Sequence, residues 1–203
     1  MLYICENPDG ALSSDSLQEA LKTLPTFRRN YALSYHFEHD RKACVLAYQL
    51  LAKALKAEYN LHEMPRWGYG ASGKPHLEDH PSIHFNLSHC KNAVCCIISN
   101  EEVGVDVETI ITFDEALAHE ICSEKEYHHI LNSTDPSLEL TKLWTQKESY
   151  LKYKSCGLTS NIRDLFANAP NCLFTMEIKD GYVLCVCEAT KDALPHNLSP
   201  LTF

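Results

Sequence analysis

Residues 103–108, Val103-Gly104-Val105-Asp106-Val107-Glu108, lie near the middle of a 203-residue chain and carry its clearest strand pattern. In an extended strand, successive side chains point to opposite faces, so Gly104, Asp106 and Glu108 share the face opposite the valines. The valine face predicts a core on that side. The two carboxylates repel each other unless water solvates them or a hard cation such as Mg²⁺ bridges them. A solvated edge strand and a metal-binding strand both remain open, and Gly104 would let a ligand approach the backbone.

Length and composition limit the class of protein. With 45% apolar residues, 203 residues suffice for one sizeable core or two small fused ones, and nothing indicates disorder. The ten cysteines form no C-x-x-C pair, which predicts buried free thiols in a reducing cytoplasm, with a zinc site as the alternative. Most lie inside apolar runs: Cys44, Cys95, Cys96, Cys172, Cys185 and Cys187.

Charge and hydropathy argue against two further classes. A formal net charge of -9 disfavours a nucleic-acid surface, because phosphate binding there rests on clustered lysines and arginines. Leu2 to Cys5 is too short for the apolar core of a signal peptide, and the longest apolar run, Ala93 to Ile98, cannot span a bilayer. We therefore expect a cytoplasmic globular protein that binds neither nucleic acid nor membrane.

The N-terminal part predicts a strand at Leu2 to Cys5, a helix from Ser16 to Leu24 that Pro25 ends, and an amphipathic helix from Asp40 to Lys56. Phe27-Arg28-Arg29 is the first basic pair, and it is expected in an ordinary solvated loop.

Asp40 is expected to cap the second helix, which would place Arg41 and Lys42 in its first turn. Cations there are unfavourable against the helix dipole unless an anion arrives, so anion binding and simple surface exposure both remain open.

A glycine-rich loop from Gly68 to Pro75 contains Lys74 but lacks the Walker spacing of a phosphate loop. Residues 83–88 then alternate apolar and polar, residues 93–99 predict a buried strand, and a turn leads into the central strand. The pattern predicts a three-stranded meander that places Ser88 and His89 in one sheet with Asp106.

Two capping-box patterns follow, Thr112-x-x-Glu115 and Ser123-x-x-Glu126, and the second gives Glu126 a structural reason to exist. A helix is predicted from about Ser137 to Lys154, with Gly157 as its stop. On this helix Glu148 and Lys152 share a face, which alone indicates a surface ion pair.

Strands at Cys172 to Ile178 and Tyr182 to Cys187 are joined by the hairpin signal Lys179-Asp180-Gly181, and the last fifteen residues look irregular. Helix followed by antiparallel strands thus occurs in both parts of the chain. We expect an α+β fold made of a pseudo-twofold pair of similar α/β halves, residues 1–102 and 103–203, each a mainly antiparallel sheet packed with helices and fused into one unit.

Three blocks of sequence together resemble the signature motifs of the 4′-phosphopantetheinyl transferase superfamily, Sfp type. They occur in the order of that family and at about its spacing, and the likeness covers residues 28 to 160. The blocks are Gly73-Lys74-Pro75 with Phe85-Asn86-Leu87-Ser88-His89, then Gly104-Val105-Asp106-Val107-Glu108, and then Trp144-Thr145-Gln146-Lys147-Glu148-Ser149-Tyr150-Leu151-Lys152.

The resemblance implies a monomer that binds coenzyme A between its halves. With Mg²⁺, it would transfer the phosphopantetheine arm to a serine of an apo acyl or peptidyl carrier protein and release adenosine 3′,5′-bisphosphate. The implied roles are Mg²⁺ binding for Asp106, Glu108 and Glu148; coenzyme A binding for Arg41, Lys74, Ser88, His89 and Asp106, with Arg28 or Lys42 as helpers; the pyrophosphate for Lys152; and the serine proton for Glu126 or Glu148.

Two other functions are compatible with parts of the pattern. A catalytically idle module that binds carrier or coenzyme A predicts loss of an acidic ligand or of the helix lysine, and none is lost. A different Mg²⁺-dependent nucleotide hydrolase leaves Ser88-His89 and Lys147-Glu148 unexplained. Cys90 has no functional account. Because carrier proteins are acidic, we expect an apolar patch with a few local cations to recognise them.

Overall fold

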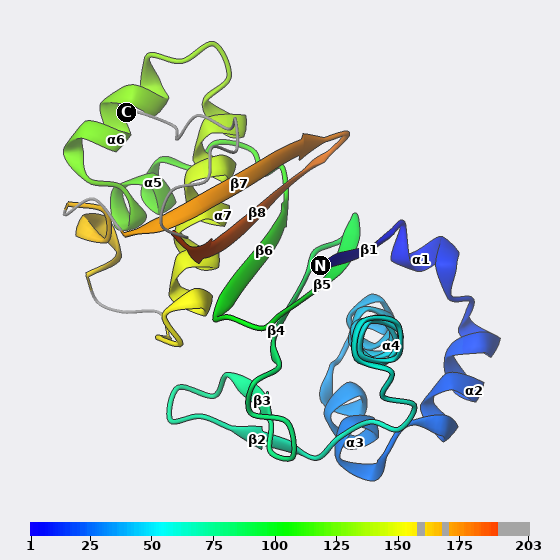
Figure 1. Cartoon of the computed structure of the whole chain (residues 1–203). Helices are drawn as coiled ribbons and strands as arrows, with labels where there is room; N and C mark the ends of the chain where they lie inside the picture. The colour runs from blue at the N-terminus through cyan, green and yellow to red at the C-terminus, as the bar shows by residue number, and fades with distance from the viewer. Residues whose placement is uncertain (158–160, 168–170, 191–203) are drawn as a thin grey trace.

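Two three-stranded antiparallel sheets form the centre of the molecule in the computed structural model, which describes residues 1–157, 161–167 and 171–190 (Figure 1). The first sheet has the strand order β1-β5-β4 and the second β6-β8-β7. Their bounds are β1 Leu2–Glu6, β4 His84–His89, β5 Ala93–Ser99, β6 Val103–Thr109, β7 Cys172–Lys179 and β8 Tyr182–Ala189. In both sheets the strand that comes last in the chain lies in the middle.

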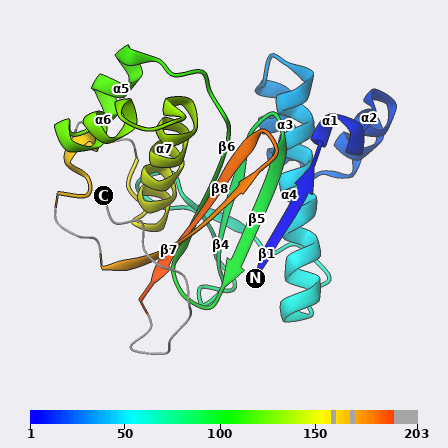
Figure 2. The ribbon, with the colours of Figure 1, turned by 90° about the horizontal axis from the view of Figure 1, so that it is seen from above.

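The two sheets pack against each other, with a long helix on each outer side (Figure 2). Helix α4, Glu38–Tyr59, covers the first sheet, and helix α7, Pro136–Tyr153, covers the second. Between the sheets, the valines of β6 contact Ala93, Cys95 and Ile97 of β5. The α+β fold of two similar halves is therefore confirmed, and the core that the valine face predicted is the seam between the sheets.

Most of the helices and strands predicted from the sequence are confirmed, and the remaining elements are shorter. The prediction at 16–24 corresponds to α2, and that at 137–154 to α7, each within two residues at both ends. The shorter elements are α1 Pro8–Ala11, α2 Ser14–Thr23, α3 Thr26–Ser34, β2 Trp67–Tyr69, β3 Pro75–Leu77, α5 Glu115–Ile121, α6 Glu124–Leu131 and the 3-10 helix Ile162–Asp164.

The predicted meander is wrong. After β5 the chain crosses to the second sheet, where β6 pairs with β8 over seven residues, from Val103 opposite Glu188 to Thr109 opposite Tyr182. In this position β6 lies over the first sheet, and its valine face is buried against Ala93, Cys95 and Ile97 of β5. Ser88 and Asp106 therefore belong to different sheets.

Two expectations in the N-terminal half are also corrected. Phe27-Arg28-Arg29 lies in helix α3, and Arg28 is buried between the rings of Tyr31 and Trp67, with its guanidinium carbon 5.0 and 5.3 Å from the ring centres. Helix α4 begins two residues earlier than predicted, with Phe37 rather than Asp40 at its cap.

In the C-terminal half, the capping box of Ser123 and Glu126 is confirmed. The capping box predicted at Thr112 and Glu115 is wrong, because the side chain of Asp114 accepts from the backbone N–H of Leu117 and caps α5. Gly157 does not end α7, since Ser155 adopts the left-handed conformation after the helix, with φ 54°. Residues 191–203, which include most of the segment expected to be irregular, lie outside the described residues.

All ten cysteines are free thiols, and six of them are buried. Within the described ranges, no helix combines the length and apolar character that crossing a bilayer requires.

Candidate active site

Gly104 sets how closely helix α7 approaches strand β6. A Cβ at this position would collide with the backbone oxygen of Ser149 and the backbone nitrogen of Tyr153. The sequence suggested that Gly104 admits a ligand; instead it admits the helix. Because Asp106 and Glu108 lie on the same face of β6 as Gly104, both carboxylates are directed toward α7.

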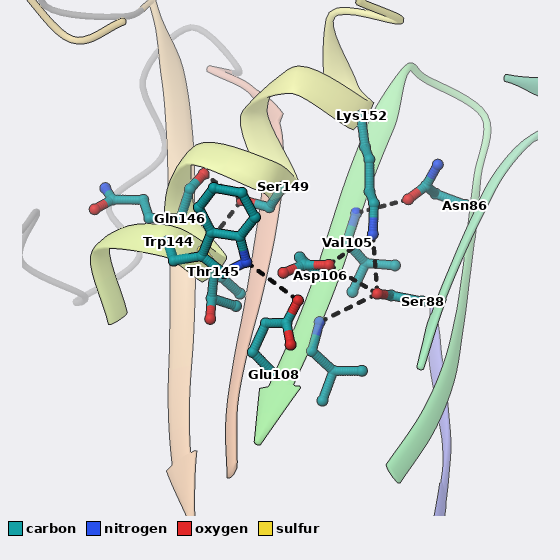
Figure 3. A network of polar contacts seen from close by, with 12 residues as sticks. Asn86, Ser88, Val105, Asp106, Glu108, Trp144, Thr145, Gln146, Ser149 and Lys152 are labelled. Carbon is teal, nitrogen blue, oxygen red and sulfur yellow. Dashed lines mark hydrogen bonds and ion pairs between the residues drawn. The ribbon is translucent and has the colours of Figure 1, made fainter. Parts of the chain in front are cut away.

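Two side chains, one from α7 and one from β4, meet Asp106 of β6, which is 2% exposed (Figure 3). The ammonium of Lys152 on α7 lies 2.6 Å from Asp106 Oδ1, and Ser88 Oγ on β4 donates to the same oxygen at 2.8 Å. Lys152 Nζ also lies 2.9 Å from Ser88 Oγ. Each of the three sequence blocks thus supplies one member of the network, and Lys152 forms its ion pair with Asp106 rather than with Glu148.

The network fixes the charge of Lys152. Burial lowers the pKa of its ammonium, but the attraction of Asp106 and then of Glu148 outweighs burial and raises the pKa above its ordinary value. Lys152 therefore remains a cation at any physiological pH.

Side chains of β4 bridge the gap between the sheets. Asn86 Oδ1 accepts from Val105 N at 3.1 Å, and Ser88 Oγ accepts from Val107 N at 3.4 Å. They satisfy backbone donors of β6 that have no strand on that side (Figure 3). No role for Asn86 was predicted from the sequence, although its alternation with Phe85 and Leu87 placed it on the same face as Ser88.

Three carboxylates crowd this region. Burial, then the charge of Asp106, raise the pKa of Glu108 to about 7, although Trp144 Nε1 donates to its Oε1 at 3.2 Å. The same two causes, in the same order, raise the pKa of Glu148. Asp106 Oδ2 and Glu148 Oε1 are buried without a hydrogen-bond donor.

These carboxylates fit the chemistry of a hard divalent cation. Among residues 1–157, 161–167 and 171–190, no three acidic, histidine or cysteine side chains already converge on one point as a ligand set. However, unpartnered buried carboxylate oxygens and raised pKa values indicate a site that a cation would relieve, and Mg²⁺ prefers carboxylate oxygens.

His89 ends strand β4 next to this network. Its ring packs edge-on against Tyr35, with ring centres 6.4 Å apart. Burial, then the neighbouring Lys152 ammonium, lower the pKa of His89, which favours the neutral imidazole.

A cavity of about 500 Å³ lies beside the start of β4, and its lining comes almost entirely from residues 70–102. Its lining includes Lys74, His84 and Glu102 from the N-terminal half and Ser155 from the segment after α7. His84 precedes Ser88 by four residues, and Glu102 precedes Asp106 by four. At a strand rise of about 3.3 Å per residue, the lining residue Phe85 lies about 10 Å from Ser88 along β4, and Glu102 lies about 13 Å from Asp106 along the chain that enters β6.

The basic residues predicted from the sequence occupy different surroundings. Lys74 lies in the cavity wall. Arg41 Nε donates to the backbone oxygen of Tyr35 at 2.9 Å, and Arg28 Nη2 donates to that of Cys44 at 3.2 Å. Lys42 forms ion pairs with acidic residues of α1 and α4, Asp9 at 3.4 Å and Glu38 at 3.2 Å.

Glu126 belongs to a separate buried cluster. Its Oε2 accepts from Ser123 N at 2.7 Å and from Lys147 Nζ at 2.8 Å. Lys147 is fully buried and also donates to the backbone oxygens of Ile121, Ile162 and Arg163. Its ammonium thus ties α7 to the neighbouring helical segments, a role that the sequence did not suggest.

Comparisons with known proteins agree with the motifs. A family model described as the 4′-phosphopantetheinyl transferase superfamily matches residues 102–190. The chain is 23% identical to the 4′-phosphopantetheinyl transferase Sfp of Bacillus subtilis, over 96% of this chain and 95% of that protein. It is 26% identical to psf-1 of Bacillus pumilus, over 88% of this chain and 84% of that protein. It is 31% identical to AcpT of Salmonella typhi, over 70% of this chain and 74% of that protein. The chain belongs to the 4′-phosphopantetheinyl transferase superfamily.

Proposed function

We propose that this protein transfers the 4′-phosphopantetheine arm of coenzyme A to a serine of an apo acyl or peptidyl carrier protein and releases adenosine 3′,5′-bisphosphate. The observation that carries the proposal is the Lys152–Asp106–Ser88 network, in which the three motif blocks meet at one buried point. The relatives above bear the names of enzymes of this class.

The positions of the cavity and the network support coenzyme A as the ligand. An elongated ligand with a nucleotide at one end can place that end in the cavity near Lys74 and its pyrophosphate about 10 Å away, near Ser88, His89 and Lys152. In this arrangement Lys152 lies beside the phosphorus under attack. Arg28 and Arg41 are further candidates for the phosphates.

Asp106, Glu108 and Glu148 are the residues that would hold Mg²⁺. Bound there, the ion would neutralise charge on the pyrophosphate and make the phosphorus a better electrophile. The fit rests on the unpartnered oxygens of Asp106 and Glu148 and on the raised pKa of Glu108.

The residues of the chain account for the remaining requirements. The serine oxygen forms a bond to phosphorus, the bond from phosphorus to the bisphosphate oxygen breaks, and the hydroxyl proton must pass to a base. Lys152 offsets the charge that grows on the leaving phosphate. Glu148, first a candidate metal ligand, is also the better candidate base, since its raised pKa favours proton transfer and Glu126 is engaged by Lys147.

We further propose that the protein acts as a monomer in the cytoplasm. One chain supplies the cavity lining and all members of the network, and ten free thiols suit a reducing compartment.

The proposal is tested by the intact mass of several apo carrier proteins after incubation with the protein, coenzyme A and Mg²⁺. We expect one phosphopantetheine arm to be added to at least one carrier, and a chelator, Asp106→Ala or Glu148→Ala to prevent the addition. Coenzyme A binding without any mass gain would favour an idle binding module.

A further inference from the structure

In the cavity wall, the carboxylate of Glu102 forms an ion pair with Lys74. Glu102 Oε2 lies 2.8 Å from Lys74 Nζ, and Glu102 Oε1 lies 3.2 Å from His84 Nδ1. All three residues line the cavity of about 500 Å³. An anionic ligand that enters the cavity therefore meets an ammonium whose charge is compensated in advance.

Glu102 is ionised in this arrangement. Partial burial alone would raise the pKa of its carboxyl group, but the hydrogen bond and charge of Lys74, followed by His84, lower it. At neutral pH the carboxylate thus competes with any phosphate for Lys74, and it also repels that phosphate directly.

Lys74 does not need Glu102 to stay in the cavity wall. Its Nζ also donates to the backbone oxygen of Val103 at 3.2 Å, and its own backbone oxygen accepts from Gly70 N at 2.9 Å. The Lys74 side chain is only 14% exposed, whereas that of Glu102 is 50% exposed. Loss of the carboxylate charge would therefore free the ammonium and leave its anchor in place.

We propose that Glu102 is an affinity-determining residue, an internal competitor for Lys74 that weakens the binding of phosphate-bearing nucleotides in the cavity. The inference rests on the proposed function, because it identifies the cavity with the nucleotide end of coenzyme A. It predicts that Glu102 weakens the binding of the bisphosphate product as well as that of the substrate, and so assists product release.

The experiment measures the dissociation constant of adenosine 3′,5′-bisphosphate by calorimetry. Glu102→Gln should bind it about fivefold more tightly than the wild type, the scale expected when a partly exposed ion pair is removed. Glu101→Gln is the matched control, because it removes the same charge from the exposed neighbouring residue, for which no contact with Lys74 is seen. Its affinity should stay close to that of the wild type.

The effect should depend on Lys74. In a Lys74→Met background, Glu102→Gln should change the affinity less than twofold. Unchanged or weaker binding by Glu102→Gln, equal effects at positions 101 and 102, persistence without Lys74, or no measurable binding to any variant would overturn the inference. If Glu102→Gln does not bind the bisphosphate more tightly while the wild type still loads a carrier, only this inference is lost and the proposed function stands.

Discussion

Lys152 Nζ lies 2.6 Å from Asp106 Oδ1, and this ion pair joins the last turn of α7 to the middle of β6. Asp106 is 2% exposed and the Lys152 side chain 28% exposed. The pair therefore has a structural consequence as well as a catalytic one, because either partner alone would leave a charge in a largely desolvated place.

Lys152→Met should lower the free energy of unfolding by about 2 kcal/mol in the presence of a chelator, because Asp106 loses its counter-charge and keeps only the Ser88 hydroxyl. Urea unfolding measures the change. Lys154→Met is the control, because it removes the same charge from an exposed lysine that contacts the rings of Tyr150 and Tyr153 rather than a buried carboxylate. Equal stabilities for the two variants would contradict a structural role for the ion pair.

Glu108→Gln should change the pH dependence of stability. Because folding raises the pKa of Glu108 from 4.5 to about 7, its favourable contribution is complete below about pH 4.5 and is lost as the pH rises to about 7. In chelator, the variant should therefore gain stability relative to the wild type between pH 5 and pH 8. A difference in unfolding free energy that is independent of pH would show that Glu108 titrates normally.

Gly104→Ala should destabilise the protein by about 1 to 3 kcal/mol, because the new methyl group meets the backbone of α7. It should also reduce transfer activity, since Glu148 and Lys152 move with the helix. Gly157→Ala serves as the control, because a Cβ there meets nothing within 4 Å. The thermal unfolding midpoints of the two variants decide the matter, and matching midpoints would refute tight packing at Gly104.

Glu126→Gln and Glu148→Gln should separate a structural carboxylate from a catalytic one. Glutamine preserves the capping box with Ser123, so Glu126→Gln should lose stability but keep its turnover number within about threefold. Glu148→Gln should lose a factor on the order of 10² to 10⁴ in turnover. Comparable losses of turnover in both would return Glu126 to the list of catalytic candidates.

The sequence predicted what local patterns determine. The alternation in residues 103–108 identified the buried valine face, and the spacing of Ser123 and Glu126 identified a helix start, because both depend only on neighbouring residues. The motif blocks identified residues 88, 106 and 152, which the fold brings together.

Long-range packing accounts for what the sequence did not show. The choice of β8 as the partner of β6 depends on a segment more than 70 residues away, so the short turn after β5 suggested a false hairpin. The burial of Arg28 likewise depends on Trp67, and the use of Gly104 depends on the approach of α7. Hydropathy near each residue carries none of this information.

Transferase activity is tested most directly by the stoichiometry of the reaction with one accepted carrier, measured as holo-carrier by intact mass and as adenosine 3′,5′-bisphosphate by chromatography. We expect one bisphosphate per phosphopantetheine arm, with none released when the carrier serine is replaced by alanine. Release of bisphosphate without a carrier would instead identify a hydrolase.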